Sequence, residues 1–222
     1  MKICYVTIDS LIEGVGRSQI VPHLELLAEL GQEVVVVSLE KREDDDMLQR
    51  LQANNISWIS LDFGNQGILE GVFRFFRLAK SLPNADVYHA RSDVPALAMI
   101  LKRRKPFLWD VRSLWVEQKS DSQPKKKILK ILKYFWIFIE RLISSQASAL
   151  NVLAHSLVPI LEKRCKRLPQ IKTVIPTTVN LEKFEFSPKI MNRRRILLSG
   201  TFNNFYDISR IKEFLKIGRA HV

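Results

Sequence analysis

The sequence feature that most constrains the fold is a regular alternation of short apolar runs with longer segments of helical periodicity. Residues 3–8 form a nearly continuous apolar run, as in a strand that is buried on both faces. Residues 20–30 instead place Ile, Leu and Ala at helical spacing. Repeated along the chain, this alternation predicts an α/β fold, with a Rossmann-like parallel sheet, helices on both faces and right-handed crossovers. The predicted strands are residues 3–8, 34–39, 56–61, 86–89, 107–111, 149–153 and 173–175, and the predicted helices are residues 20–30, 47–53, 68–82, 94–104, 125–146 and 157–166.

The rhythm changes near Asn180 and predicts the domain organisation. Residues 1–180 form the first Rossmann-like domain, and the irregular, polar residues 181–194 are typical of a linker. Residues 195–216 then supply the first strand and helix of a second α/β domain, which cannot bury a core alone. Residues 217–222 (IGRAHV) break the helical pattern and match the translation of a common sequencing-adapter sequence. We therefore expect a non-native tail on a truncated chain.

The charge is distributed unevenly between the two halves of the 222 residues. Residues 1–101 hold 9 Lys/Arg and 14 Asp/Glu, for a net charge of −5, whereas residues 102–222 hold 26 and 9, for a net charge of +17. A half this basic indicates an anionic partner, such as nucleic acid, an anionic membrane or a phosphorylated substrate.

The compartment is predicted from the cysteines and from the longest apolar stretches. Cys4 lies in an apolar run and Cys165 among charges, so the two indicate no disulfide framework and favour a reducing cytosol. The apolar run at the N-terminus is too short for a signal peptide. Residues 142–161 carry no charge, but they include seven Ser, Gln, Asn and His side chains that a bilayer would have to desolvate. We therefore reject a transmembrane segment there.

Three groups of polar residues follow predicted strands, where ligands bind to open parallel sheets. After the first strand, Gly14 and Gly16 with Arg17 and Ser18 precede a helix, and Ser18 is the expected N-cap. Two glycines at a helix N-terminus allow a phosphate or sugar to approach the backbone closely. Gln19 occupies the position of the third glycine in the dinucleotide fingerprint, so an ordinary tight turn remains the alternative.

The other two groups follow the fourth and fifth strands. His89, Arg91 and Ser92 combine an imidazole, a guanidinium and a hydroxyl that suit an anionic or hydroxyl-rich ligand. The alternative for this group is a solvated turn with a helix cap at Ser92 or Asp93. Asp110 and Arg112 are two residues apart and share a face of an extended chain, where a mutual ion pair is the simpler interpretation. No Cys/His spacing in the sequence is typical of zinc.

Taken together, four segments resemble the GT-B glycosyltransferases of family four. The segments are residues 14–19 (GVGRSQ) with 22–27 (PHLELL), residues 89–92 (HARS) with 110–113 (DVRS), residues 174–184 (VIPTTVNLEKF), and residues 196–202 (ILLSGTF) with 206–207 (YD). The third is similar to the family's "IPNGVD…F" stretch at the domain hinge, and the fourth to the first strand of its donor domain. They occur in the family's order and cover nearly the whole chain.

The resemblance implies two facing Rossmann-like domains, of which the first binds the acceptor and the second the nucleotide-sugar, with retention of the anomeric configuration and no metal. Asp110 stands where many relatives carry a catalytic-site His or Asp, and would orient the acceptor hydroxyl or stabilise positive charge on the sugar. The residues implied in substrate binding on the acceptor side are Gly14, Gly16, Arg17, Ser18, His89, Arg91, Ser92 and Arg112, and the donor side begins at Gly200.

The sequence also departs from the family pattern. Asn180 replaces the frequent Asp, Thr177 and Thr178 replace Asn-Gly, and the family's glutamate-rich donor motif belongs to a region that these residues do not include. The expected protein is a retaining glycosyltransferase of cell-surface polysaccharide synthesis, inactive as this truncated chain. A non-catalytic Rossmann-like ligand-binding module is the alternative. The expected partners are a nucleotide-diphospho-sugar, which is a co-substrate rather than a cofactor, and a glycan or lipid-linked acceptor.

The basic half has one further interpretation. Residues 125–139 place the five lysines Lys125, Lys126, Lys127, Lys130 and Lys133 beside a dense apolar and aromatic run. This pattern favours contact with an anionic membrane at its inner face by an otherwise cytoplasmic protein, with a core helix as the alternative. Nucleic acid is not an expected partner, because the aromatic residues cluster rather than alternate with base-stacking spacing.

Overall fold

A computed structural model describes residues 1–65, 67–114, 127–177 and 213, with the side chains of residues 68 and 127–132 left aside. The chain divides into two compact units, of which the first is Met1–Leu114 with Tyr134–Val179 and the second is Trp115–Lys133 with Asn180–Val222. The first unit contains the whole sheet. The predicted linker, the start of the second domain with Gly200, the tail, and Lys125 and Lys126 lie outside the described residues.

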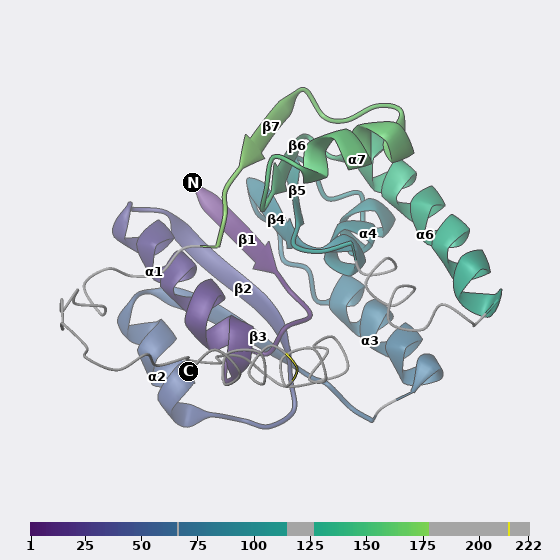
Figure 1. The fold of residues 1–222 in the computed structure, drawn as a ribbon. Helices are drawn as coiled ribbons and strands as arrows, with labels where there is room; N and C mark the ends of the chain where they lie inside the picture. The colour runs from purple at the N-terminus through teal and green to yellow at the C-terminus, as the bar shows by residue number, and fades with distance from the viewer. Residues whose placement is uncertain (66, 115–126, 178–212, 214–222) are drawn as a thin grey trace, which may run out of the picture. The chain divides into compact units, whose positions relative to one another are not determined.

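A seven-stranded sheet forms the centre of the first unit, and all six pairs of neighbouring strands are parallel. Its strands are β1 (Lys2–Val6), β2 (Glu33–Glu40), β3 (Ile56–Asp62), β4 (Val87–Arg91), β5 (Phe107–Val111), β6 (Ala149–Val152) and β7 (Ile171–Val174). The spatial order is β3-β2-β1-β4-β5-β6-β7, so the chain leaves β3 at one edge and returns to the middle beside β1 (Figure 1).

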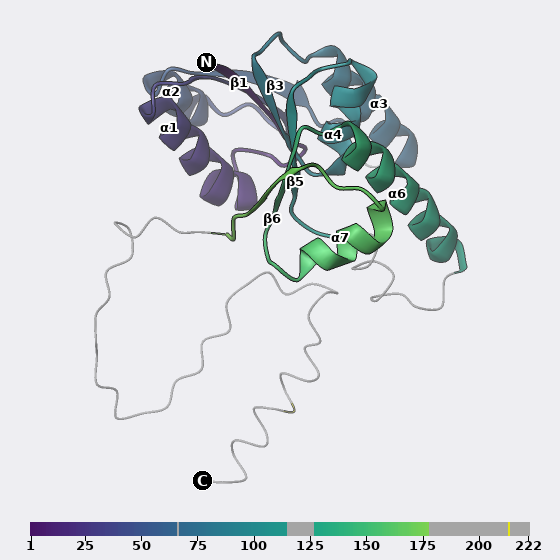
Figure 2. The same ribbon diagram turned by 90° about the horizontal axis from the view of Figure 1, so that it is seen from above.

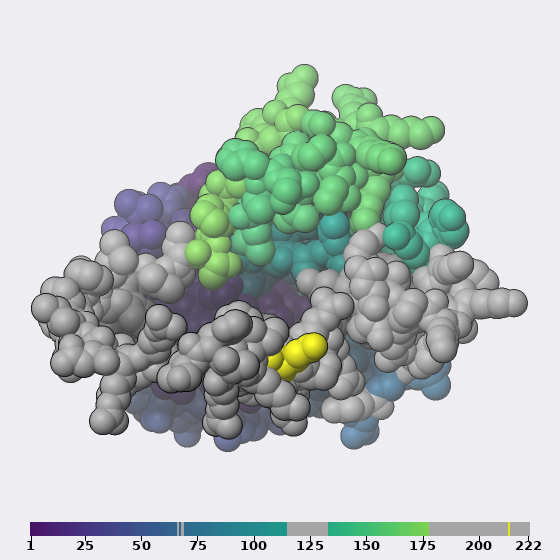
Figure 3. All heavy atoms as spheres, in the orientation of Figure 1, coloured from purple at the N-terminus to yellow at the C-terminus, as the bar shows by residue number. Residues whose placement is uncertain are grey.

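Helices cover both faces of this sheet, as Figure 2 shows from above. The helical elements are η1 (Gly16–Ile20), α1 (Val21–Glu29), α2 (Asp45–Ala53), α3 (Ile68–Lys80), α4 (Asp93–Leu101), α6 (Lys127–Gln146) and α7 (Leu157–Cys165). One core cluster joins Leu24 of α1 and Leu51 of α2 to Val34 and Val36. A second cluster packs α3, α4, α6 and α7 against the opposite face. In the space-filling view, the green atoms of α7 and β7 form a continuous surface at one end (Figure 3).

This arrangement confirms the predicted α/β fold, and the helix starts have clear local causes. Asp44 caps α2, because its Oδ1 accepts a hydrogen bond of 2.8 Å from the backbone N of Met47. Asp45 and Asp46 then lie in the first turn, where acidic side chains interact favourably with the positive end of the helix dipole.

The predicted N-cap role of Ser18 is wrong. The chain is already helical at Gly14, and Ser18 lies inside η1. Its hydroxyl donates to the backbone carbonyl of Gly14 at 2.9 Å, the local bond that serine makes to a preceding helical turn. The helix therefore begins earlier than its apolar periodicity indicates.

Candidate active site at the switch point of the sheet

The strand order reverses direction between β1 and β4, and this is where ligands bind in open α/β sheets. β1 continues into the loop that carries Asp9, β4 ends in His89 and Arg91, and neighbouring β5 carries Asp110. In the β4–β5 register Arg91 lies opposite Asp110. The sheet thus brings polar residues together at the carboxyl ends of three neighbouring strands.

The carboxylate of Asp110 lies at the centre of these residues and is only 3% exposed. Its Oδ1 accepts a hydrogen bond of 2.7 Å from Asn151 Nδ2 and lies 3.6 Å from Arg112 Nη1. Its Oδ2 lies 3.2 Å from His89 Nε2 and 4.0 Å from Arg91 Nη1. Both oxygens are therefore occupied by groups of the protein itself.

Electrostatics keep this carboxylate ionised. Burial on its own would raise the pKa of Asp110, but the hydrogen bond and charge of His89, the charge of Arg112 and the Asn151 amide outweigh burial. The pKa of Asp110 is consequently lowered from its ordinary value. Asp110 is thus a fixed negative charge at neutral pH.

A second shared partner links the two arginines. Gln19 Oε1 accepts hydrogen bonds from Arg91 Nη2 at 3.4 Å and from Arg112 Nη2 at 3.2 Å. Arg91 Nε also donates to Asp9 Oδ2 at 3.0 Å, and the Asp9 side chain remains 45% exposed. The guanidiniums are thereby held beside β5 by Gln19 of η1 and, for Arg91, also by Asp9 of the loop after β1.

Two further rings pack against His89. The ring of Tyr5 lies 4.3 Å from that of His89 between centroids, and the ring of His23 lies edge-on at 5.6 Å. Burial, with a smaller contribution from His89, lowers the pKa of His23 to about 4. His23 is consequently an uncharged neighbour of the site at neutral pH.

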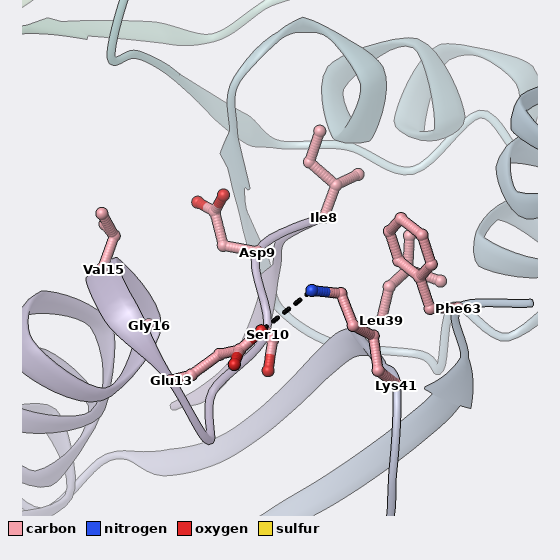
Figure 4. A pocket seen from close by; sticks show the side chains of 9 residues that line it. All are labelled: Ile8, Asp9, Ser10, Glu13, Val15, Gly16, Leu39, Lys41 and Phe63. Carbon is pink, nitrogen blue, oxygen red and sulfur yellow. Dashed lines mark hydrogen bonds and ion pairs between the residues drawn. The ribbon is translucent and has the colours of Figure 1, made fainter. Parts of the chain in front are cut away.

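A pocket of about 290 Å³ adjoins these groups beside the loop after β1 (Figure 4). Its apolar lining includes Leu39 and Phe63, and Asp9 and the ion pair of Glu13 and Lys41 supply charge. Gly16 also lines it, and a Cβ added at Gly16 would lie 1.8 Å from the carbonyl oxygen of Ser10. Only glycine permits η1 to pass this close to the loop.

The buried carboxylate of Glu40 fixes the same loop by hydrogen bonds. Its Oε1 accepts hydrogen bonds from the backbone N of Leu11 at 2.8 Å and from Ser38 Oγ at 2.6 Å, and its Oε2 accepts one from Ser10 Oγ at 2.5 Å. One carboxylate at the end of β2 therefore fixes the backbone that presents Asp9 and Gly16.

The structure brings together some of the sequence-predicted site residues and separates others. Asp110, His89, Arg91 and Arg112 form one cluster, and the predicted ion pair of Asp110 with Arg112 is present. Arg17 and Ser18 are exposed on η1. Ser92 occupies the N-cap position of α4 with φ at 77° and no capping bond from its side chain, while its backbone N donates to the carbonyl of Asp110.

The other predicted cap, Asp93, has a different role. Its carboxylate is buried and accepts hydrogen bonds from the indole nitrogens of Trp109 at 3.0 Å and Trp136 at 2.6 Å. The segment after β4 is therefore a packed helix start rather than the solvated turn that the sequence left open.

Sequence reasoning missed Tyr5, Asp9, Gln19, His23 and Asn151. Gln19 entered the sequence argument only as the residue that replaces the third glycine of the dinucleotide fingerprint. Asn151 had a signal, because an amide inside the short apolar strand β6 is buried and needs a partner. Asp9 also had one, because it follows β1 directly at the edge where the other groups lie.

In the described part of the chain, a metal-binding cluster and a membrane-spanning helix are both absent. Among its residues, no three His, Cys, Asp or Glu side chains are arranged to hold a metal ion. None of its helices is long and apolar enough to cross a membrane.

Comparison with known proteins shows similarity at the level of fold. No protein-family profile and no curated protein sequence matches the chain. Among solved structures, it is similar to HepE (Alr3699) of Anabaena, crystallised with UDP and glucose, at 13% identity and a TM-score of 0.52 over 85% of this chain and 47% of HepE. The chain thus spans about half the length of that protein.

Two other solved structures are similar at lower TM-scores. A glycosyltransferase of Rickettsia africae matches at 16% identity and 0.47, over 83% of this chain and 45% of its own. UGT89C1 of Arabidopsis thaliana, complexed with UDP, matches at 14% identity and 0.45, over 80% of this chain and 53% of its own.

Proposed function

We propose that this chain is the acceptor side of a retaining GT-B glycosyltransferase of family four, which moves a sugar from a nucleotide-diphospho-sugar to a glycan or lipid-linked acceptor. The observation that carries the proposal is the cluster of Asp110, His89, Arg91 and Arg112 at the switch point of the sheet, in which Asp110 and Arg91 are buried. HepE, which shares the fold, was crystallised with UDP and glucose, and this supports a nucleotide-sugar as donor.

Asp110 acts in this proposal as a buried negative charge. Such a charge stabilises the positive charge that develops on the transferred sugar in the transition state. Because both of its oxygens are occupied, Asp110 orients the acceptor hydroxyl through His89, whose side chain is 14% exposed. Arg91 and Arg112, tied together by Gln19, supply cations for phosphate or acceptor groups.

The donor is held, on this proposal, by residues beyond the described part of the sheet domain, including Gly200. Catalysis in a cleft depends on both walls positioning the reactants. We therefore propose that residues 1–222 bind an acceptor but do not transfer sugar alone. A lipid-linked acceptor fits an enzyme of polysaccharide synthesis that works in the cytoplasm, at the inner face of the membrane.

Assays of residues 1–222 and of the full product of the gene would test this function. Each protein is incubated with radiolabelled UDP-glucose, other nucleotide-sugars and membrane extract, and transfer to lipid or glycan is counted. Transfer by the full product, lowered at least about tenfold by Asp110→Asn, supports the proposal. Acceptor binding without transfer by the full product indicates a non-catalytic ligand-binding module instead.

A further inference from the structure

Helix α3 carries two apolar stripes on different faces. Leu78 and Ala79 point into the core that lies between the helices and the sheet. The second stripe has the helical spacing i, i+3, i+4, i+7 but is exposed to solvent. It consists of Leu69, Val72, Phe73 and Phe76, with exposed fractions of 77%, 49%, 62% and 55%.

Helix α6 repeats this arrangement over its residues in the first unit. Ile139 and Ile143 belong to the same core as α3, so the two helices cover the same face of the sheet, with α4 in that layer as well (Figure 2). The outward residues of α6 are Tyr134, Phe135, Phe138 and Leu142, with exposed fractions of 76%, 57%, 62% and 37%. We name these eight outward residues of α3 and α6 the aromatic face.

On helices α3, α4 and α6 the exposed charges have one sign, whereas α7 of the same layer carries the exposed Glu162, which pairs with Lys172 at 3.1 Å. The acids of α3, α4 and α6 are Glu70, Asp93 and Glu140. Glu70 pairs with Arg77, Asp93 is buried against two indoles, and Glu140 is buried and pairs with Arg164. The exposed ionic side chains of these three helices and of the loop after α4 are instead cationic, namely Lys80, Lys102, Arg103, Lys105 and Arg141.

We propose that the aromatic face docks on an anionic lipid bilayer. Phenylalanine and tyrosine on the outward stripe of a helix, accompanied by basic side chains, are the composition of helices that lie in a membrane interface. Each Lys or Arg near such a surface adds attraction that salt screens. The contact is peripheral and stands whether or not the protein transfers sugars. It does not depend on the lysines at 125–133, four of whose side chains lie outside the described part of the chain.

Vesicle co-sedimentation of residues 1–222 tests the proposal. Vesicles of phosphatidylcholine alone are compared with an equal mixture of phosphatidylcholine and phosphatidylglycerol, at low and high salt. The wild-type protein should bind the mixed vesicles, and high salt should release most of it. Phe73→Ser/Phe76→Ser and Phe135→Ser/Phe138→Ser should each weaken binding at least about tenfold.

The matched control lies across the sheet. Leu26→Ser/Leu30→Ser removes two leucines of and just after α1 that are 53% and 66% exposed, and it should leave vesicle binding unchanged. Circular dichroism confirms that each variant is folded. Two results would overturn the proposal: a wild-type protein that ignores mixed vesicles at low salt, or aromatic-face variants that bind as the control does. If the wild-type protein is instead a dimer that does not bind vesicles, and the same variants are monomers, the aromatic face contacts a second copy of the chain.

Discussion

At the scale of single residues, the candidate site is built from side chains that fix one another's protonation. Asp110 stays ionised because His89, Arg112 and Asn151 outweigh the effect of burial on its pKa. His23 stays neutral because burial and its neighbour His89 lower its pKa. The site thus places an ionised Asp110 and a neutral His23 beside His89 at neutral pH, and each of these two residues has a measurable consequence.

The first prediction concerns the stability that depends on His23. Its folded pKa of about 4 lies below the unfolded value of about 6.5, so the unfolded chain binds more protons between these pH values. The free energy of unfolding should therefore fall as the pH is lowered from about 6.5 to about 4, by at most about 3 kcal/mol. His23→Gln should remove this dependence in urea unfolding measured at several pH values.

The control for this titration is His155→Gln, which changes an exposed histidine. In this variant the free energy of unfolding should depend on pH as it does in the wild-type protein. If His23→Gln and the wild-type protein lose stability in parallel between these pH values, His23 is not the group that titrates.

The second prediction concerns turnover by the proposed glycosyltransferase, assayed with any further domain that its gene encodes. Asp110→Asn removes the buried negative charge and its contacts with His89 and Arg112, and should lower turnover at least about tenfold, which corresponds to roughly 1.4 kcal/mol of barrier. Asp46→Asn, at an exposed position of α2, is the matched change of charge and should leave turnover intact. Equal turnover in both variants, measured with the true acceptor, would remove Asp110 from the mechanism.

At the scale of elements, the loop after β1 depends on contacts that its own sequence does not contain. Glu40 comes from the end of β2, and Gly16 allows η1 to pass against the carbonyl of Ser10. The loop presents Asp9 to Arg91 only while both contacts hold. Substitutions at the two glycines of this loop distinguish close packing from backbone conformation.

The third prediction compares these glycines. Gly16→Ala would place a methyl group within 1.8 Å of a backbone oxygen, so the loop must move, and we expect a loss of about 2 kcal/mol or more in the free energy of unfolding. In Gly14→Ala the added methyl group has no neighbour within 4 Å. The only penalty is the positive φ of 54°, and we expect it to lower the free energy of unfolding by about 1 kcal/mol. Urea unfolding gives both values. Similar losses in the two variants would contradict the close approach at Gly16.

The element order could be predicted from the sequence, because burial on both faces leaves continuous apolar strands that local patterns reveal. β5 was predicted with its observed bounds, Phe107–Val111, and the predicted polar residues after β4 and β5 do meet. The remaining site contacts join residues that lie far apart in the chain. Asn151 reaches Asp110 across 41 positions and Arg91 reaches Asp9 across 82, and no local pattern encodes either pair.

At the scale of the whole molecule, one face of the sheet is covered by helices that are apolar on both sides. The exposed aromatic residues on α3 and α6 were not predicted. When a helix carries two apolar stripes, its sequence does not show which of the two packs against the core. The predicted lysine-rich segment lies mostly outside the described side chains, so its membrane contact stays a prediction.

The fourth prediction applies to residues 1–222 as a unit. We expect calorimetry to detect no tight binding of UDP-glucose, and we expect no transfer to membrane extract, because the proposed donor residues lie beyond the sheet domain. Removal of residues 217–222 should change neither result. Robust turnover by residues 1–222 would contradict the assignment of the donor to a second domain.

The order of strands in the sheet has a consequence for biosynthesis. β1, β2 and β3 lie within the first 62 residues and are neighbours, so a nascent chain can pair them soon after they leave the ribosome. The other edge of β1 then stays unpaired until β4 is synthesised. The cluster around Asp110 is completed only when Asn151 arrives on β6. A nascent chain that stops between β3 and β6 therefore has an unpaired sheet edge and lacks Asn151, so we expect it to expose apolar strands to chaperones.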